Sequence, residues 1–140
     1  MNKFEDVIDM FLNLISEIKY ANYDIDELKL ELGIKSKMVL AEVRVIKDVK
    51  FSLDECDFTR ELTDLEALII ANGLVVSWVS PKVNNFELFE SQSSSKNFTI
   101  FSNSNLLNSL RGLRDECQAR LNTLIADYDY DQTFIQDGDK

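Results

Sequence analysis

Residues 62–83 read LTDLEALIIANGLVVSWVSPKV, and this stretch predicts the helix around which the rest of the chain folds. Thr63 is a good N-cap residue, and Glu66 three residues later completes a capping box. Pro81 disfavours continuation of a helix, so we expect the helix to end there. Apolar residues fall on every side between these signals, and a helix that is apolar all round is buried all round. The stretch therefore predicts a central core helix.

Three residues inside this predicted helix indicate how the helix is packed. Trp78 lies about one turn before Pro81 and is predicted to be a core residue. Asn72 needs hydrogen-bond partners if it is buried. Gly73 costs about 1 kcal/mol relative to alanine within a helix, so we expect another backbone to approach closely at this position.

The composition indicates one acidic globular domain. The chain has 140 residues, 45% of them hydrophobic, and a net charge of −10 from 25 acidic and 15 basic residues. This charge argues against nucleic acid and against an anionic membrane surface as partners, although it is compatible with a local basic patch. Acidic residues interrupt the N-terminal apolar pattern, which argues against a signal peptide. The longest apolar run, residues 67–79, is shorter than a membrane span. We expect a soluble protein.

The sequence carries no evident catalytic constellation. Histidine is absent, which removes the commonest general base and metal ligand. Cys56 and Cys117 fit no metal-ligand spacing, and Cys117 is expected in the core. None of the four glycines forms a phosphate-binding loop. We predict no enzymatic activity, no cofactor and no metal site.

The first quarter of the chain predicts two helices. Apolar residues at helical spacing predict a helix over residues 4–20. Asp24 and Glu27 then predict a capped helix that stops at Gly33. The alternation of leucines before Gly33 also fits a strand, and we favour the helix because its cap and its stop are both present.

Residues 36–54 combine helical and β-branched patterns. Ser36 is a suitable cap, and we expect a helix to about Ile46 followed by an extended piece through Leu53. The β-branched residues of the same region make a β-hairpin the alternative. Residues 54–61 are expected to be a polar connection into the central helix.

The C-terminal half predicts one long amphipathic helix. After Pro81 we expect irregular structure or a short helical turn over residues 83–89, and a flexible serine-rich loop over residues 91–97. Ser104 then caps a helix over residues 105–127. Its apolar stripe consists of Leu106, Leu110, Leu113, Cys117, Leu121, Leu124 and Tyr128. At about 1.5 Å per residue this helix is about 35 Å long, so we expect part of it to project toward a partner.

These elements predict a mainly α fold. Residues 1–130 form a single-domain helical bundle with a buried central helix and a long C-terminal amphipathic helix. A short β element within residues 36–54 is the alternative to helix in that region. Residues 131–140 are expected to form an acidic flexible tail.

The candidate interaction surface lies on the last predicted helix and its acidic end. It consists of Arg111, Arg114, Arg120, Asp127, Asp129 and Asp131. Arginines suit phosphate or carboxylate partners, but pairing with Asp115 and Glu116 on the same helix is the simpler interpretation. The alternating aspartates are similar to the start of a calcium loop. Gln132 occupies the position of that loop's turn glycine, so a solvated acidic segment is favoured.

Two parts of the sequence, ELTDLEALIIANGLVVSWVSPKV and FSNSNLLNSLRGLRDECQARLNTLIADYDY, follow a common pattern of helix signals. These two strings resemble a family of small acidic proteins encoded among the head and neck genes of tailed bacteriophages. They share with the family a capping box, a core helix ending in W-x-x-P, a polar loop, a Phe-Ser helix entry, an Asn-Leu-Leu start and a terminal acidic and tyrosine-containing segment. The resemblance covers about residues 59–130 and is loose over residues 1–54. The chain departs from the family at Asn103, where the family often has proline, and in the charge-rich stretch of residues 42–50.

The resemblance implies a neck or head–tail connector protein that joins the portal and capsid to the tail. Such a subunit is mainly helical and not an enzyme, and it is made in the host bacterial cytoplasm before it enters the virion. Its implied partners are the portal, neighbouring neck or tail-completion proteins and further copies of itself in a homo-oligomeric ring. The alternative is a small acidic helical regulator or inhibitor that binds another protein.

Overall fold

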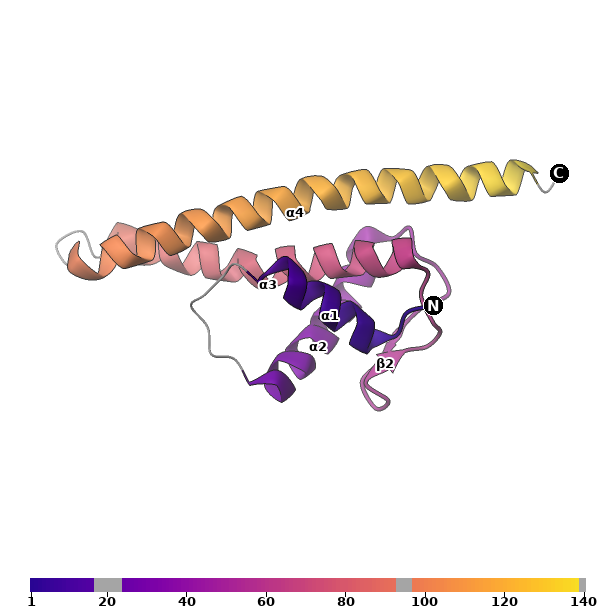
Figure 1. Ribbon diagram of the computed structural model, residues 1–140, viewed down its shortest axis with the longest axis horizontal. Coiled ribbons are helices and arrows are strands. Elements are labelled where there is room, and N and C mark those ends of the chain that lie inside the picture. Colours follow the sequence, from indigo (N-terminus) through magenta and orange to yellow (C-terminus); the bar gives the residue numbers. More distant parts are fainter. Residues whose placement is uncertain (17–23, 93–96, 139–140) are drawn as a thin grey trace.

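A computed structural model describes residues 1–16, 24–92 and 97–138 of the chain (Figure 1). The structure is 74% helical. Within the described ranges the elements are α1 (Phe4–Leu14), α2 (Ile25–Val43), β1 (Phe51–Ser52), β2 (Asp57–Phe58), α3 (Asp64–Gln92) and α4 (Asn97–Gly138). The mainly α, single-domain prediction is therefore confirmed.

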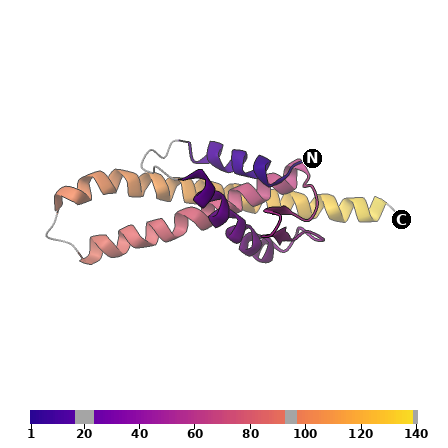
Figure 2. The ribbon, with the colours of Figure 1, turned by 90° about the horizontal axis from the view of Figure 1, so that it is seen from below.

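The architecture is a long antiparallel helix pair with a small body packed against one part of it. Helices α3 and α4 lie side by side, and α1 and α2 pack against α3 (Figures 1 and 2). Helix α4 has 42 residues and, at about 1.5 Å per residue, is about 63 Å long. A compact domain of this chain length has a radius of gyration of only about 14 Å. The C-terminal part of α4 consequently extends beyond the body (Figure 1).

Helix α3 forms the centre of the core, as its sequence predicts. Its apolar residues from Ala67 to Val83 are mostly buried. Trp78 is 3% exposed and meets Phe11 of α1 edge to face, with ring centroids 5.5 Å apart. The predicted core position of Trp78 is confirmed. The predicted capping box is also present, because the Glu66 amide donates to Thr63 Oγ1 at 3.2 Å and the Thr63 amide donates to Glu66 Oε1 at 2.9 Å.

The predicted end of this helix at Pro81 is wrong, because α3 continues to Gln92. Proline lacks the N–H that would bond the carbonyl four residues earlier, and that carbonyl belongs to Ser77. Lys35 Nζ of α2 donates to the Ser77 carbonyl at 3.3 Å. A tertiary contact thus satisfies the acceptor that the proline leaves free. Residues 83–89, expected to be irregular or to form a short helical turn, belong to the continuous helix α3.

The predicted break between residues 33 and 36 is also wrong, because α2 runs unbroken from Ile25 to Val43. Asp24 caps it as expected, accepting from the amides of residues 26 and 27. Gly33 is a packing residue: a Cβ there would lie 2.9 Å from Phe51 Cε1. Ser36 is buried, and its hydroxyl donates to the Leu32 carbonyl at 2.8 Å rather than capping a new helix.

Gly73 also serves close packing, although the partner is not a backbone as expected. A Cβ at Gly73 would lie 2.7 Å from Cγ1 of Val39 on α2. Asn72 is fully buried; its amide donates to the Leu68 carbonyl at 2.8 Å, and its Oδ1 has no hydrogen-bond partner among the described residues.

A short antiparallel hairpin replaces part of the expected polar connection. Phe51 pairs with Phe58 and Ser52 with Asp57, so β1 confirms a β element within residues 36–54, and β2 lies where none was expected. Phe4 of α1 contacts both hairpin phenylalanines, with centroids 4.7 and 5.9 Å away. Buried aromatic packing, rather than strand length, holds this two-residue pairing.

Helix α4 exceeds its predicted bounds at both ends. Ser104 lies inside the helix instead of capping it, and the helix passes residue 127 and continues to Gly138. Residues 97–111 and 113–137 contain no proline and no glycine, so no helix-breaking residue ends the helix within these ranges. Residues 131–138, expected to belong to an acidic flexible tail, are helical, and their mobility stays a prediction.

The first helix, expected over residues 4–20, ends earlier, because α1 stops at Leu14 and Ile15 is its C-cap. Residues 17–20 of that expected helix and residues 93–96 of the expected loop lie outside the described part.

Candidate interaction surfaces

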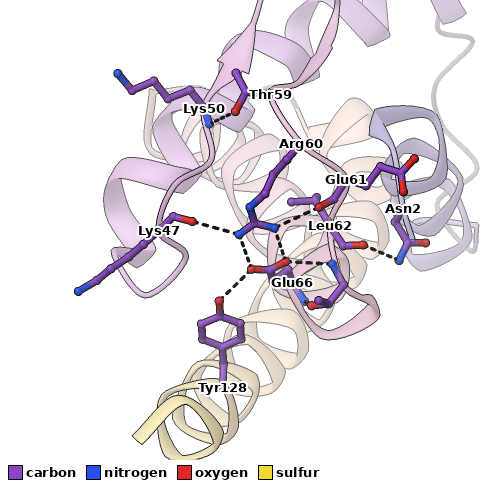
Figure 3. Close-up of polar contacts among 10 residues, drawn as sticks. Asn2, Lys47, Lys50, Thr59, Arg60, Glu61, Leu62, Glu66 and Tyr128 are labelled. Carbon is purple, nitrogen blue, oxygen red and sulfur yellow. Dashed lines mark hydrogen bonds and ion pairs between the residues drawn. The ribbon is translucent and has the colours of Figure 1, made fainter. Parts of the chain in front are cut away.

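A buried polar network joins the start of α3 to α4 and to the segment before the hairpin (Figure 3). Glu66 is 2% exposed and accepts from both terminal nitrogens of Arg60, each at 2.9 Å. The hydroxyl of Tyr128 donates to Glu66 Oε2 at 2.8 Å. Arg60 also donates to the Lys47 carbonyl at 3.0 Å. The Glu66 carboxylate thereby connects the start of α3 with α4 and with the segment of Arg60, and Arg60 extends the network to Lys47, before the hairpin.

The network keeps its carboxylate charged. Burial by itself opposes the charge on Glu66, but hydrogen bonds from Arg60, the Thr63 amide and Tyr128 outweigh it and lower its pKa to about 2. Burial, together with the hydrogen bond to the Glu66 carboxylate, raises the pKa of Tyr128 to about 12. The hydrogen bond to Glu66 raises the pKa of Arg60. Glu66 is therefore an ionised anchor, and the arrangement fixes the C-terminal part of α4 to the body.

The sequence predicts roles for Glu66 and Tyr128, but it does not predict that the two side chains meet. Glu66 was identified as a capping residue and Tyr128 as the last residue of an apolar stripe. The two residues are 62 positions apart, and no local spacing pairs them. The available signal was the presence of a carboxylate and a polar-tipped aromatic on two helices predicted to pack together.

The predicted arginines lie on α4 and pair mainly within it. Arg114 Nε lies 3.2 Å from Asp115 Oδ1, and Arg120 Nη2 lies 2.8 Å from Glu116 Oε1. Both acidic partners are exposed. Arg111 is half-buried and is also engaged in an interaction. Pairing on the same helix, the simpler of the two interpretations, is thus observed for Arg114 and Arg120, and exposed pairs of this kind contribute only about 0.3–0.5 kcal/mol.

The predicted aspartates lie on the projecting part of α4. Asp127 and Asp129 are exposed on either side of the buried Tyr128, and Tyr130 is 69% exposed. Asp131 continues the same helix. A continuous helix does not form the loop of an EF-hand site. The structure keeps the aspartates together in one segment and places that segment away from the paired arginines at residues 114 and 120.

Among the cavities that open on the described surface, three lie between the elements discussed above. One, of about 450 Å³, lies between the end of α1 and α4 and includes Arg120, Glu116 and Cys117 in its wall. A larger groove of about 710 Å³ lies among α2, α3 and α4. The third, of about 350 Å³, lies between α2 and the segment around β1.

The cysteines and acidic residues do not assemble into a reactive centre in the part of the chain that the structure describes. Cys117 is buried, as expected, and burial raises the pKa of its thiol. Cys56 is exposed in the hairpin turn. Among the described residues no group of three or more cysteine and carboxylate side chains is placed to hold a metal ion.

Helix α3 is longer than the apolar run of residues 67–79 that the sequence shows. By length and composition alone, the segment Asp64–Asn85 is long enough and apolar enough to cross a membrane. However, 61% of the residues in its apolar window are buried inside the protein, which is the property of a core helix.

Comparisons of the chain with protein families, with characterised proteins and with solved structures found no match.

Proposed function

We propose that this chain is a structural subunit of the neck of a tailed bacteriophage, where it connects the portal and capsid to the tail. Its partners are the portal, adjacent neck or tail-completion proteins and further copies of the same chain in a ring. The proposal rests on the resemblance carried by residues 59–130. It places the protein in the virion after synthesis in the host bacterial cytoplasm.

The observation that most supports a connecting role is the projecting end of α4. Tyr128 is held by Glu66 and, through it, by Arg60, so the helix leaves the body in a fixed direction. Asp127, Asp129 and Tyr130 are exposed beside and beyond this anchor. A helix that extends past its own core suits contact between subunits better than it suits the stability of one subunit.

Deletion of the gene from a phage that encodes the chain tests this function. We expect DNA-filled heads and separate tails, with few joined particles, and restoration by the chain supplied in trans. Electron microscopy of lysates and counts of infectious particles give the readout. Normal yields of joined, infectious particles after deletion would contradict the proposal and would favour a regulator that acts on another protein.

A further inference from the structure

A pocket with a basic rim lies beside the C-terminal half of α2. It is lined by Lys37, Leu40, Ala41, Val49, Lys50 and Phe51. Val49 and Phe51 are buried in its floor, whereas Lys37 and Lys50 are exposed at its rim. Neither lysine forms an ion pair within the described ranges. The pocket thus combines an apolar floor with two uncompensated positive charges.

The segment that contains most of this pocket has a net charge opposite to that of the whole chain. Residues 29–50 contain six basic and three acidic residues, a net charge of +3, in a chain whose net charge is −10. Figure 3 shows that the side chains of Lys47 and Lys50 both extend away from the Arg60 network. Such a local reversal of sign attracts acidic groups and repels basic ones.

An exposed apolar row on α2 continues from the pocket. Leu30, Ile34 and Met38 are 61%, 48% and 52% exposed. They are spaced by four residues and therefore share one helix face, which Ala41 of the pocket wall extends. The opposite face of α2 packs against the core, where Leu28, Leu32 and Val39 are buried. This row is the kind of surface on which an amphipathic segment docks.

The chain itself carries a segment of matching chemistry at the end of α4. Residues 127–140 contain five aspartates and one lysine, a net charge of −4, together with Tyr128, Tyr130, Phe134 and Ile135. Ten residues of α4 follow Tyr128, which corresponds to about 15 Å of helix. Both views show this end directed away from the body (Figures 1 and 2).

We propose that the acidic end of α4 of one copy docks on the basic-rimmed pocket and the adjoining α2 row of a second copy. Asp127 and Tyr130 lie three residues apart on one face of α4. Asp127 faces Lys37 and Lys50 across the contact. Tyr130 covers apolar surface beside the pocket, while Asp129 adds to the negative charge of this end. The two surfaces differ, so the contact is heterologous and repeats from copy to copy, as in a ring or a filament. Its biological role as the repeating contact of a neck assembly rests on the function proposed above.

Sedimentation velocity of the full-length protein over a concentration series tests the contact. We expect the wild-type chain to associate, and increasing salt to weaken that association because exposed charges are screened. The pocket variant Lys37→Glu/Lys50→Glu and the helix-end variant Asp127→Lys/Asp129→Lys should each raise the dissociation constant by about tenfold or more. Circular dichroism confirms that each variant keeps its helical content.

Matched controls carry the same charge changes elsewhere. Lys3→Glu/Arg114→Glu matches the pocket variant, and Asp9→Lys/Glu55→Lys matches the helix-end variant; all four positions lie outside the pocket, outside the basic segment of residues 29–50 and outside the end of α4. Both controls should associate as the wild type does. Association lost equally in the controls would show a general effect of net charge and would overturn the proposal.

Mixing the two defective variants gives the sharpest result. Each variant supplies the surface that the other lacks, so the mixture should associate although neither variant does so alone. A mixture that stays monomeric, or a wild-type chain that is monomeric throughout the concentration series, overturns the contact. These results leave the connector function open, because that function is decided separately by whether particles join without the protein.

Discussion

Replacement of Glu66 by glutamine should remove the charge that connects α3, α4 and the Arg60 segment. The pKa of Glu66 falls from the ordinary value of 4.5 to about 2 on folding, and each pKa unit corresponds to about 1.4 kcal/mol. The shift of about 2.5 units therefore corresponds to about 3 kcal/mol of stability at neutral pH. Glu66 is 2% exposed, so solvent screening does not reduce this value strongly. We expect Glu66→Gln to lower the free energy of unfolding by about 2–4 kcal/mol at neutral pH.

The effect of Glu66→Gln should depend on pH in a defined direction. A carboxylate with a lowered pKa in the folded state stabilises the protein above the unfolded pKa of 4.5, and this contribution is lost as pH falls from 4.5 toward about 2. The wild type and the variant should therefore converge in stability over that range. Urea unfolding monitored by circular dichroism at neutral pH and at about pH 3 measures the difference.

Glu61→Gln is the matched control, because Glu61 is an exposed carboxylate five residues earlier. It should change stability by less than about 0.5 kcal/mol. A difference of under about 1 kcal/mol between wild type and Glu66→Gln at neutral pH, or a difference that does not shrink in acid, would refute the reasoning.

Four further substitutions test the core and the helices. Trp78→Ala should destabilise by about 3–5 kcal/mol, and a loss below 1 kcal/mol in denaturant unfolding would be inconsistent with its burial against Phe11. Gly33→Ala should destabilise because its Cβ would meet Phe51 at 2.9 Å, whereas Gly112→Ala, with nothing within 4 Å of its Cβ, should stabilise by about 0.5–1 kcal/mol; thermal melts that show the same sign for both would contradict this pair. Tyr128→Phe should cost about 1.5–3 kcal/mol. It should also remove the loss of stability that the raised pKa of Tyr128 predicts for the wild type as pH rises from 10 to about 12, so an unchanged alkaline profile would argue against the hydrogen bond to Glu66.

The features predicted correctly from sequence depend on local spacing. The capping box of Thr63 and Glu66, the cap at Asp24 and the core position of Trp78 each follow from residues within a few turns of one another. At these sites the local sequence pattern and the tertiary packing favour the same structure. The stripe that ends at Tyr128 also follows from one period along one helix.

The features that were missed depend on contacts between distant segments. Pro81 did not end α3 because Lys35 of another helix reaches the carbonyl that the proline leaves free. Gly33 did not end α2 because its missing side chain makes room for Phe51. In both cases the sequence predicts the end of a helix from the residue type alone, whereas contacts with another segment determine the role of the residue.

The candidate site was predicted only in part for the same reason. Arg114 and Arg120 were correctly placed on the last helix, and their pairing on that helix follows the i, i+1 and i, i+4 neighbours visible in the sequence. The anchor formed by Arg60, Glu66 and Tyr128 and the basic-rimmed pocket of α2 each combine segments that only the fold brings together. No period or motif in one segment predicts them.

Quantitative mass spectrometry of purified phage particles tests the central claim, that this chain is a structural part of the virion neck, most directly. The account predicts that the protein is present in infectious particles at a fixed copy number that is comparable to that of the portal, and that it stays with the heads or the tails when particles are dissociated. Infectious particles that contain no detectable copy of the chain would contradict the claim.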